Sequence, residues 1–95
     1  MENFEVAHLR IQNVDVVVVF VSQDFAHRSS DEQERTHAEL QLCASTAGLH
    51  GNVVLVWADS FGRMGFRAPQ NQHPFFSSVS YVDLRSQINR RLSCG

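Results

Sequence analysis

Apolar residues concentrate in two short runs of the chain, residues 16–21 and residues 53–58. The first run is too short to cross a membrane, which takes about 20 residues, and its β-branched residues favour a strand. Successive side chains of a strand point to opposite faces, so both faces of this strand are apolar. A strand that needs cover on both faces is typical of the centre of a largely parallel α/β sheet.

A helix is predicted between the two runs, over residues 31–47. Ser29 or Ser30 can cap its first turn, and Gly48 suits the left-handed residue that often ends a helix. The residues that recur at helical spacing on its apolar stripe are Leu40, Leu42, Cys43, Ala44 and Ala47. Strand, helix and strand together predict a βαβ unit with a right-handed crossover, whose two strands lie parallel and adjacent.

The flanking segments predict further strands and a second helix. Residues 4–12 alternate weakly, which suits an edge strand, although a short helix or an N-terminal extension over residues 1–13 stays open. Residues 59–65 are turn material, and residues 66–68 suit a hairpin strand that returns beside the second run. Ser80 can cap a final helix with an apolar side that runs from Tyr81 to Leu92.

These elements define the predicted fold class, a single α/β (or α+β) domain over residues 1–95. We expect a small mixed sheet of three to four strands with two helices, in the order β-β-α-β-β-α around the central βαβ unit. A chain of 95 residues suits one small domain.

The charge balance excludes several functions. The net charge of -2 makes nucleic acid an unlikely partner, because proteins that bind nucleic acid usually carry a strong basic patch. All 8 basic residues are arginine, so lysine Schiff-base chemistry and a P-loop lysine are excluded, whereas arginine suits bidentate binding of anions. No cofactor motif is present.

The two cysteines lie at positions that indicate neither a disulfide framework nor a zinc site. Cys43 shares the apolar stripe of the predicted helix and is interpreted as a small core residue, and Cys94 lies next to the last residue. A reducing compartment is therefore expected. The first residues show no basic segment followed by a long apolar stretch, so we expect no secretory signal, no membrane partner and a cytoplasmic location.

Ligands of open α/β sheets bind beyond the carboxyl ends of the parallel strands, where loops converge and helix N-termini point. In this chain the rule selects the loops after the two apolar runs. The predicted ligand-binding residues are Asp24, Arg28, Ser29, Ser30, Asp59 and Arg63. Serine hydroxyls and arginine guanidinium groups would suit an anion, although the acids of the first helical turn compete for the same positive helix end.

An alternative prediction is that the same two loops form a metal site or a catalytic site. Asp24, His27 and Asp59 could hold a divalent metal, or act as base and acid in a metal-dependent hydrolase. An aspartate directly after a strand is more often a turn former that accepts hydrogen bonds from nearby backbone N–H groups. We therefore assign neither a metal site nor a catalytic site, and we expect a protein that is not an enzyme.

The expected role is that of a small binding or interaction protein for an unknown small molecule or protein partner. If both helices lie on one face of the sheet, the other apolar face needs a partner. Self-association as a homodimer follows from that condition.

Several short motifs in the second half of the chain carry a family resemblance. They are residues 51–57, residues 62–64, Ala68-Pro69-Gln70 and His73-Pro74-Phe75-Phe76. With them, the stretch from Val14 to Leu92 resembles small uncharacterised proteins encoded by mobile gene cassettes of bacterial integrons. The resemblance implies a bacterial, cytoplasmic accessory protein, and it brings no catalytic motif.

Overall fold

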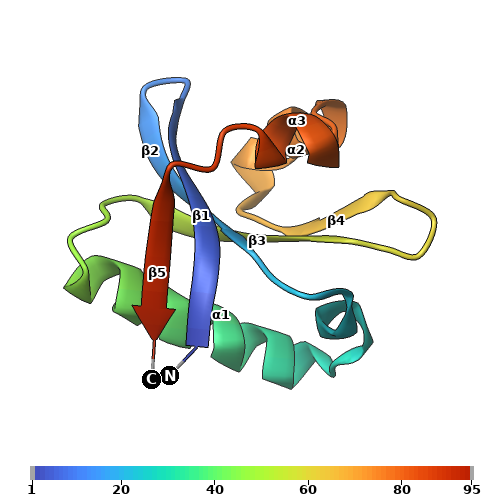
Figure 1. The fold of residues 1–95 in the computed structure, drawn as a ribbon, viewed down its shortest axis with the longest axis horizontal. Helices are drawn as coiled ribbons and strands as arrows, with labels where there is room; N and C mark the ends of the chain where they lie inside the picture. The colour runs from blue at the N-terminus through green and yellow to red at the C-terminus, as the bar shows by residue number, and fades with distance from the viewer. Residues whose placement is uncertain (1, 95) are drawn as a thin grey trace.

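The computed structural model describes residues 2–94, which form a five-stranded mixed sheet with helices on both faces (Figure 1). The strands are β1 (Glu2–Ile11), β2 (Val14–Phe20), β3 (Asn52–Ala58), β4 (Met64–Arg67) and β5 (Arg90–Cys94). The helices are α1 (Ser30–Thr46), α2 (His73–Ser78) and α3 (Tyr81–Arg85), with the 3-10 helices η1 (Gln23–His27) and η2 (Gln70–Gln72). The order across the sheet is β4-β3-β2-β1-β5, so β2 is the central strand.

The predicted βαβ unit is confirmed. β2 and β3 pair in parallel, with Val18 opposite Val54, and α1 joins them. The hydroxyl of Ser29 accepts a hydrogen bond from the backbone N–H of Glu32 at 3.2 Å, which caps α1. Gly48 follows the helix with φ +83°, a conformation that glycine adopts without steric cost.

Each face of the sheet is covered by this chain's own helices (Figure 1). Under α1, the buried residues of β2 and β3 are Val17, Val19, Val53 and Leu55, which pack with Leu40 and Ala44. On the opposite face, Val16, Val18, Phe20, Val54 and Val56 pack with Phe76 of α2 and Leu84 of α3. The condition that led to a homodimer, both helices on one face, is therefore not met, and the homodimer stays a prediction.

The predicted edge position of the first strand is wrong. β1 lies inside the sheet, antiparallel to β2 on one side and to β5 on the other. Gln12 and Asn13 connect β1 to β2 with φ +50° and +65°, as in a two-residue hairpin turn. Its weak alternation has a physical reason, since adjacent residues Val6 and Ala7 are both fully buried, one on each face.

The predicted final helix is only partly confirmed. Ser80 caps α3 by accepting a hydrogen bond from the backbone N–H of Asp83 at 3.1 Å, but the helix ends at Arg85 and the chain continues into β5. Leu84 and Leu92 are both buried, yet they belong to cores on opposite faces of the sheet. They therefore cannot form one helical stripe, although their spacing in the sequence suits one. Leu42 also differs from its prediction, because 69% of it is exposed on α1.

The prediction that the cysteines stay unpaired is wrong. Cys43 of α1 and Cys94 of β5 form a disulfide, with their Cα atoms 6.0 Å apart. The error follows from the final helix, because a helix ending near residue 92 gives no reason for Cys94 to approach α1. As a strand, β5 runs across α1 and brings the two residues together (Figure 1). Disulfides persist mainly in oxidising compartments, so the expected reducing compartment loses its support.

Candidate functional site: a cleft at the carboxyl end of β2

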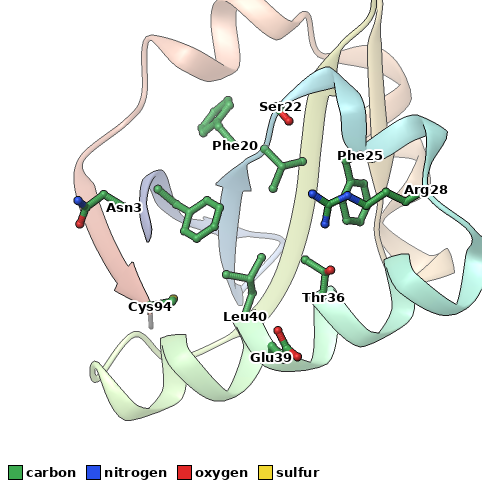
Figure 2. A pocket seen from close by; sticks show the side chains of 11 residues that line it. Asn3, Phe20, Ser22, Phe25, Arg28, Thr36, Glu39, Leu40 and Cys94 are labelled. Atoms are coloured by element: carbon green, nitrogen blue, oxygen red, sulfur yellow. The ribbon is translucent and has the colours of Figure 1, made fainter. Parts of the chain in front are cut away.

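A cleft of about 460 Å³ lies at the carboxyl end of β2, above one side of α1 (Figure 2). The residues that line it are Asn3, Phe4, Phe20, Val21, Ser22, Phe25, Arg28, Thr36, Glu39, Leu40 and Cys94. Its volume is within the range of about 300–1,000 Å³ that is common for small-molecule sites. The cleft lies at the first of the two loops that the strand-end rule selected.

The sheet topology brings distant parts of the chain to this cleft. The hairpin sets β1 antiparallel to β2, so the start of β1 lies beside the end of β2. β5 is antiparallel to β1, with Asn3 opposite Ser93, so the end of the chain reaches the same edge. Asn3, Phe4 and Cys94 therefore line the cleft together with η1 and α1.

The base of the cleft is apolar. Phe25 is 2% exposed and Leu40 is 3% exposed, so both belong to the core under α1. Phe4 and Val21 pack against that core but remain only half buried. Their open apolar surface inside a concave site is where an apolar ligand would gain binding free energy, since burying apolar area contributes about 25 cal/mol per Å².

Two side chains of opposite charge stand on the rim. Arg28 extends toward the cleft from the loop after η1, whereas Glu39 lies on α1 near Thr36 (Figure 2). Among the described residues, the ion pairs within 4.0 Å are Arg10–Asp15 and Arg85–Glu5 alone. The guanidinium of Arg28 and the carboxylate of Glu39 are therefore not paired with each other.

The backbone that carries Arg28 is fixed to α1. The side-chain amide of Gln33 donates hydrogen bonds to the backbone oxygens of Phe25 and Arg28, at 3.1 and 3.2 Å. The ring of Phe25 packs at 5.2 Å from the ring of Trp57 on β3. These contacts anchor the middle of η1 and the residue that follows it, so the backbone of Arg28 is held in place.

A second arginine near this edge is already engaged. Arg85 of α3 donates a hydrogen bond to Glu5 at 2.9 Å, and its guanidinium lies 5.5 Å from the ring centre of Phe20. The hydrogen bond to Glu5 is the main reason that the pKa of Arg85 is raised above its ordinary value. Since Arg85 lies on the face opposite α1, Arg28 is the cation that lines the cleft.

The structure separates the six residues predicted to bind a ligand. Arg28 lines the cleft, but Asp24, Ser29 and Ser30 do not. Ser29 uses its hydroxyl as the cap of α1, and Ser30 is the first residue of that helix. Asp24 is exposed on η1, as is His27, the histidine of the hydrolase alternative.

Asp59 and Arg63 belong to the turn between β3 and β4. The carboxylate of Asp59 accepts hydrogen bonds from the backbone N–H groups of Phe61 and Arg63, both at 2.8 Å. This is the turn-forming role that the sequence favoured for an aspartate after a strand. The guanidinium of Arg63 lies 5.9 Å from the ring centre of Phe61, which is 82% exposed at the tip of the turn.

No group of three or more His, Cys, Asp and Glu side chains within residues 2–94 is placed to hold a metal ion. Nor does any helix of this part of the chain have the length and apolar character needed to cross a membrane.

A second, more open hollow lies between α1 and β4, lined by His37, Phe66, Arg67, Ala68, Pro69 and His73. Both of its imidazoles are engaged. His37 donates from Nε2 to the backbone oxygen of Val53, and His73 donates from Nε2 to that of Ala68. These contacts fix α1 to β3 and the start of α2 to the loop before η2, so both histidines have a structural role.

Comparison of the chain with family models, with curated proteins and with solved structures finds no match. The resemblance to integron cassette proteins therefore stays a prediction, and the function must be argued from the geometry of the cleft.

Sequence reasoning missed most of the cleft. Thr36, Glu39 and Leu40 lie within one turn and a half of a helix, so their common face was visible in the sequence. The sequence did not show that this face of the helix borders the carboxyl end of β2. Asn3 and Phe4 depend on the hairpin register, and Cys94 depends on β5, which was predicted to be helical.

Proposed function

We propose that this chain is a small binding protein whose cleft at the end of β2 takes a small amphipathic ligand with an apolar body and a carboxylate. The observation that carries the proposal is the guanidinium of Arg28, which has no carboxylate partner within 4.0 Å among the described residues and lines the same cleft as the half-buried Phe4. An arginine at the rim of an apolar cleft supplies orientation, and the base supplies affinity.

The polar groups around Arg28 support a carboxylate as the charged group of the ligand. A guanidinium can donate two parallel hydrogen bonds to a carboxylate. Ser22 and Thr36 add hydroxyl donors on the same side of the cleft (Figure 2). Asn3, whose Oδ1 accepts a hydrogen bond from Ser93, lies at the other end of the cleft from Arg28 (Figure 2).

Calorimetric titration with phenylpropionate tests the proposal, because this probe has one aromatic ring and one carboxylate. We expect saturable binding to the native protein and a loss of about tenfold or more in affinity for Arg28→Gln, since a hydrogen bond to a charged group contributes about 1.5–3 kcal/mol. Arg63→Gln is the matched control, because Arg63 lies on the β3–β4 turn outside the cleft. Equal affinity in the parent and in Arg28→Gln, or no binding to either, contradicts the proposal.

The fluorescence of Trp57 offers a local signal for the same titration. Trp57 is the single tryptophan of the chain, and its ring packs against Phe25 of the cleft. Occupation of the cleft should therefore change its emission. The hydrolase that would use Asp24, His27 and Asp59 stays a prediction, as do the homodimer and the cytoplasmic location.

A further inference from the structure

We infer that the ligand of this cleft is a zwitterion, an amino acid or short peptide with an apolar side chain, whose ammonium group binds Glu39 while its carboxylate binds Arg28. The inference rests on the proposed function and makes it more specific. Its basis is the presence of two opposite, mutually unpaired charges on the rim of one cleft with an apolar base.

The placement of Glu39 disfavours a simple anion. Thr36 and Glu39 are three residues apart on α1, so they lie on one face of the helix, and that face borders the cleft. A ligand carboxylate bound to Arg28 shares the cleft with the carboxylate of Glu39. Like charges repel each other, so a ligand with one negative charge gains from Arg28 and loses to Glu39.

A zwitterion satisfies both charges at once. Arg28 and Glu39 come from separate elements, the loop after η1 and the helix α1 (Figure 2). An ammonium group beside the ligand's carboxylate turns Glu39 from a repulsive neighbour into a hydrogen-bond acceptor. The apolar side chain then occupies the surface of Phe4 and Val21, and the ligand adds no net charge to the cleft.

Neighbouring charges on α1 leave this assignment in place. Arg35 lies one turn before Glu39 on the helix, where it could pair with that carboxylate. No ion pair joins them within 4.0 Å in residues 2–94. The exposed carboxylate of Glu39 therefore remains available to a ligand cation from the side of the cleft.

The experiment compares four probes by calorimetry: phenylalanine, phenylpropionate, phenethylamine and the dipeptide glycyl-phenylalanine. The first three share one aromatic group and differ in their charges. We expect phenylalanine or the dipeptide to bind about tenfold more tightly than phenylpropionate, and phenethylamine to bind more weakly than either zwitterion. If phenylalanine binds more tightly than the dipeptide, the ligand is a free amino acid. If the dipeptide binds more tightly, the ligand is a peptide. Either result supports the inference.

Glu39→Gln provides the decisive variant. Loss of the carboxylate should weaken the best zwitterion about tenfold, while phenylpropionate binds as well as before or better because the repulsion is removed. Glu34→Gln is the matched control, an exposed glutamate of α1 that does not line the cleft. The control variant should bind both the best zwitterion and phenylpropionate as tightly as the parent does. Circular dichroism spectra that match the parent's show that both variants fold.

Two results overturn the inference and are distinguishable from each other. If phenylpropionate binds as tightly as the zwitterions, in an Arg28-dependent manner, or if Glu39→Gln leaves their affinity ratio unchanged, the zwitterion is excluded while the proposed function stands. If none of the four probes binds, the proposed function and this inference fail together.

Discussion

Removal of the Cys43–Cys94 disulfide should strongly destabilise the fold. The bond closes a loop with a sequence separation of 51 that contains β3, β4, α2 and α3. With the chain-entropy relation, a loop of this length gives about 14 cal/mol/K, or about 4 kcal/mol at 25 °C. A domain of this size has a free energy of unfolding of about 5–14 kcal/mol, so the bond accounts for a large part of the total.

The assay compares urea unfolding of the oxidised protein with that of the same protein under dithiothreitol. Reduction should lower the free energy of unfolding by about 2–5 kcal/mol, the range measured when native disulfides of small domains are removed. A chain of this length loses about 4–8 °C in Tm for each kcal/mol, so thermal unfolding should shift by at least about 8 °C. The variant with Cys43→Ser and Cys94→Ser should match the reduced parent and show no response to dithiothreitol.

The position of the bond also connects stability to the cleft. Cys94 lines the cleft, and its partner lies on α1, the helix that carries Thr36 and Glu39. We therefore expect reduction to weaken phenylpropionate binding as well. The reasoning is refuted if thiol titration of the denatured, unreduced protein finds two free cysteines, or if the oxidised and reduced proteins unfold at the same urea concentration.

Three further substitutions test contacts that hold the sheet in place. Gly65→Ala should cost about 1–3 kcal/mol, because its Cβ would collide with the indole of Trp57; unchanged urea unfolding would show that the ring moves freely aside. Gln41→Leu should cost about 1–3 kcal/mol, because Gln41 accepts from the N–H of Val53 at 2.9 Å and donates to the oxygen of Gly51 at 3.0 Å; a stability equal to the parent's would mean that water replaces it. Asp59→Ala should cost about 1 kcal/mol through the loss of its two turn hydrogen bonds, whereas Asp59→Asn retains an acceptor and should cost less; equal losses would contradict this role.

The centre of the fold was predictable because local pattern and tertiary environment agree there. The apolar runs of β2 and β3 need cover on both faces, and the cap at Ser29 and the glycine at position 48 mark the ends of α1. Alternation also assigned the faces correctly, since Val17 and Val19 lie under α1 while Val16 and Val18 face α2 and α3.

The last third of the chain was not predictable by periodicity alone. Leu84 and Leu92 stand eight residues apart, a spacing that fits two turns of helix as well as it fits a helix followed by a strand. The choice is made by tertiary contacts, because β5 pairs with β1, with Leu92 opposite Phe4. Without β5 in place, neither the disulfide nor the wall of the cleft at Cys94 could be inferred.

The candidate site was predictable in location but not in composition. The rule for strand ends points to the exit of β2, where Arg28 lies. It cannot state which acids form turns, and Asp59 proved to be one of those. The acid of the cleft, Glu39, is sixteen residues from Gln23, the first residue of η1, and reaches the site only because α1 packs back across the face of the sheet.

The location of ligand binding tests the account most directly. Nuclear magnetic resonance of the isotope-labelled protein records the shift of each backbone amide as phenylpropionate is added. The account predicts the largest shifts around the cleft, at Ser22, Arg28, Thr36 and Glu39, and almost none at the turn between β3 and β4. Shifts centred on Asp59 and Arg63, or no shifts at any amide, would contradict it.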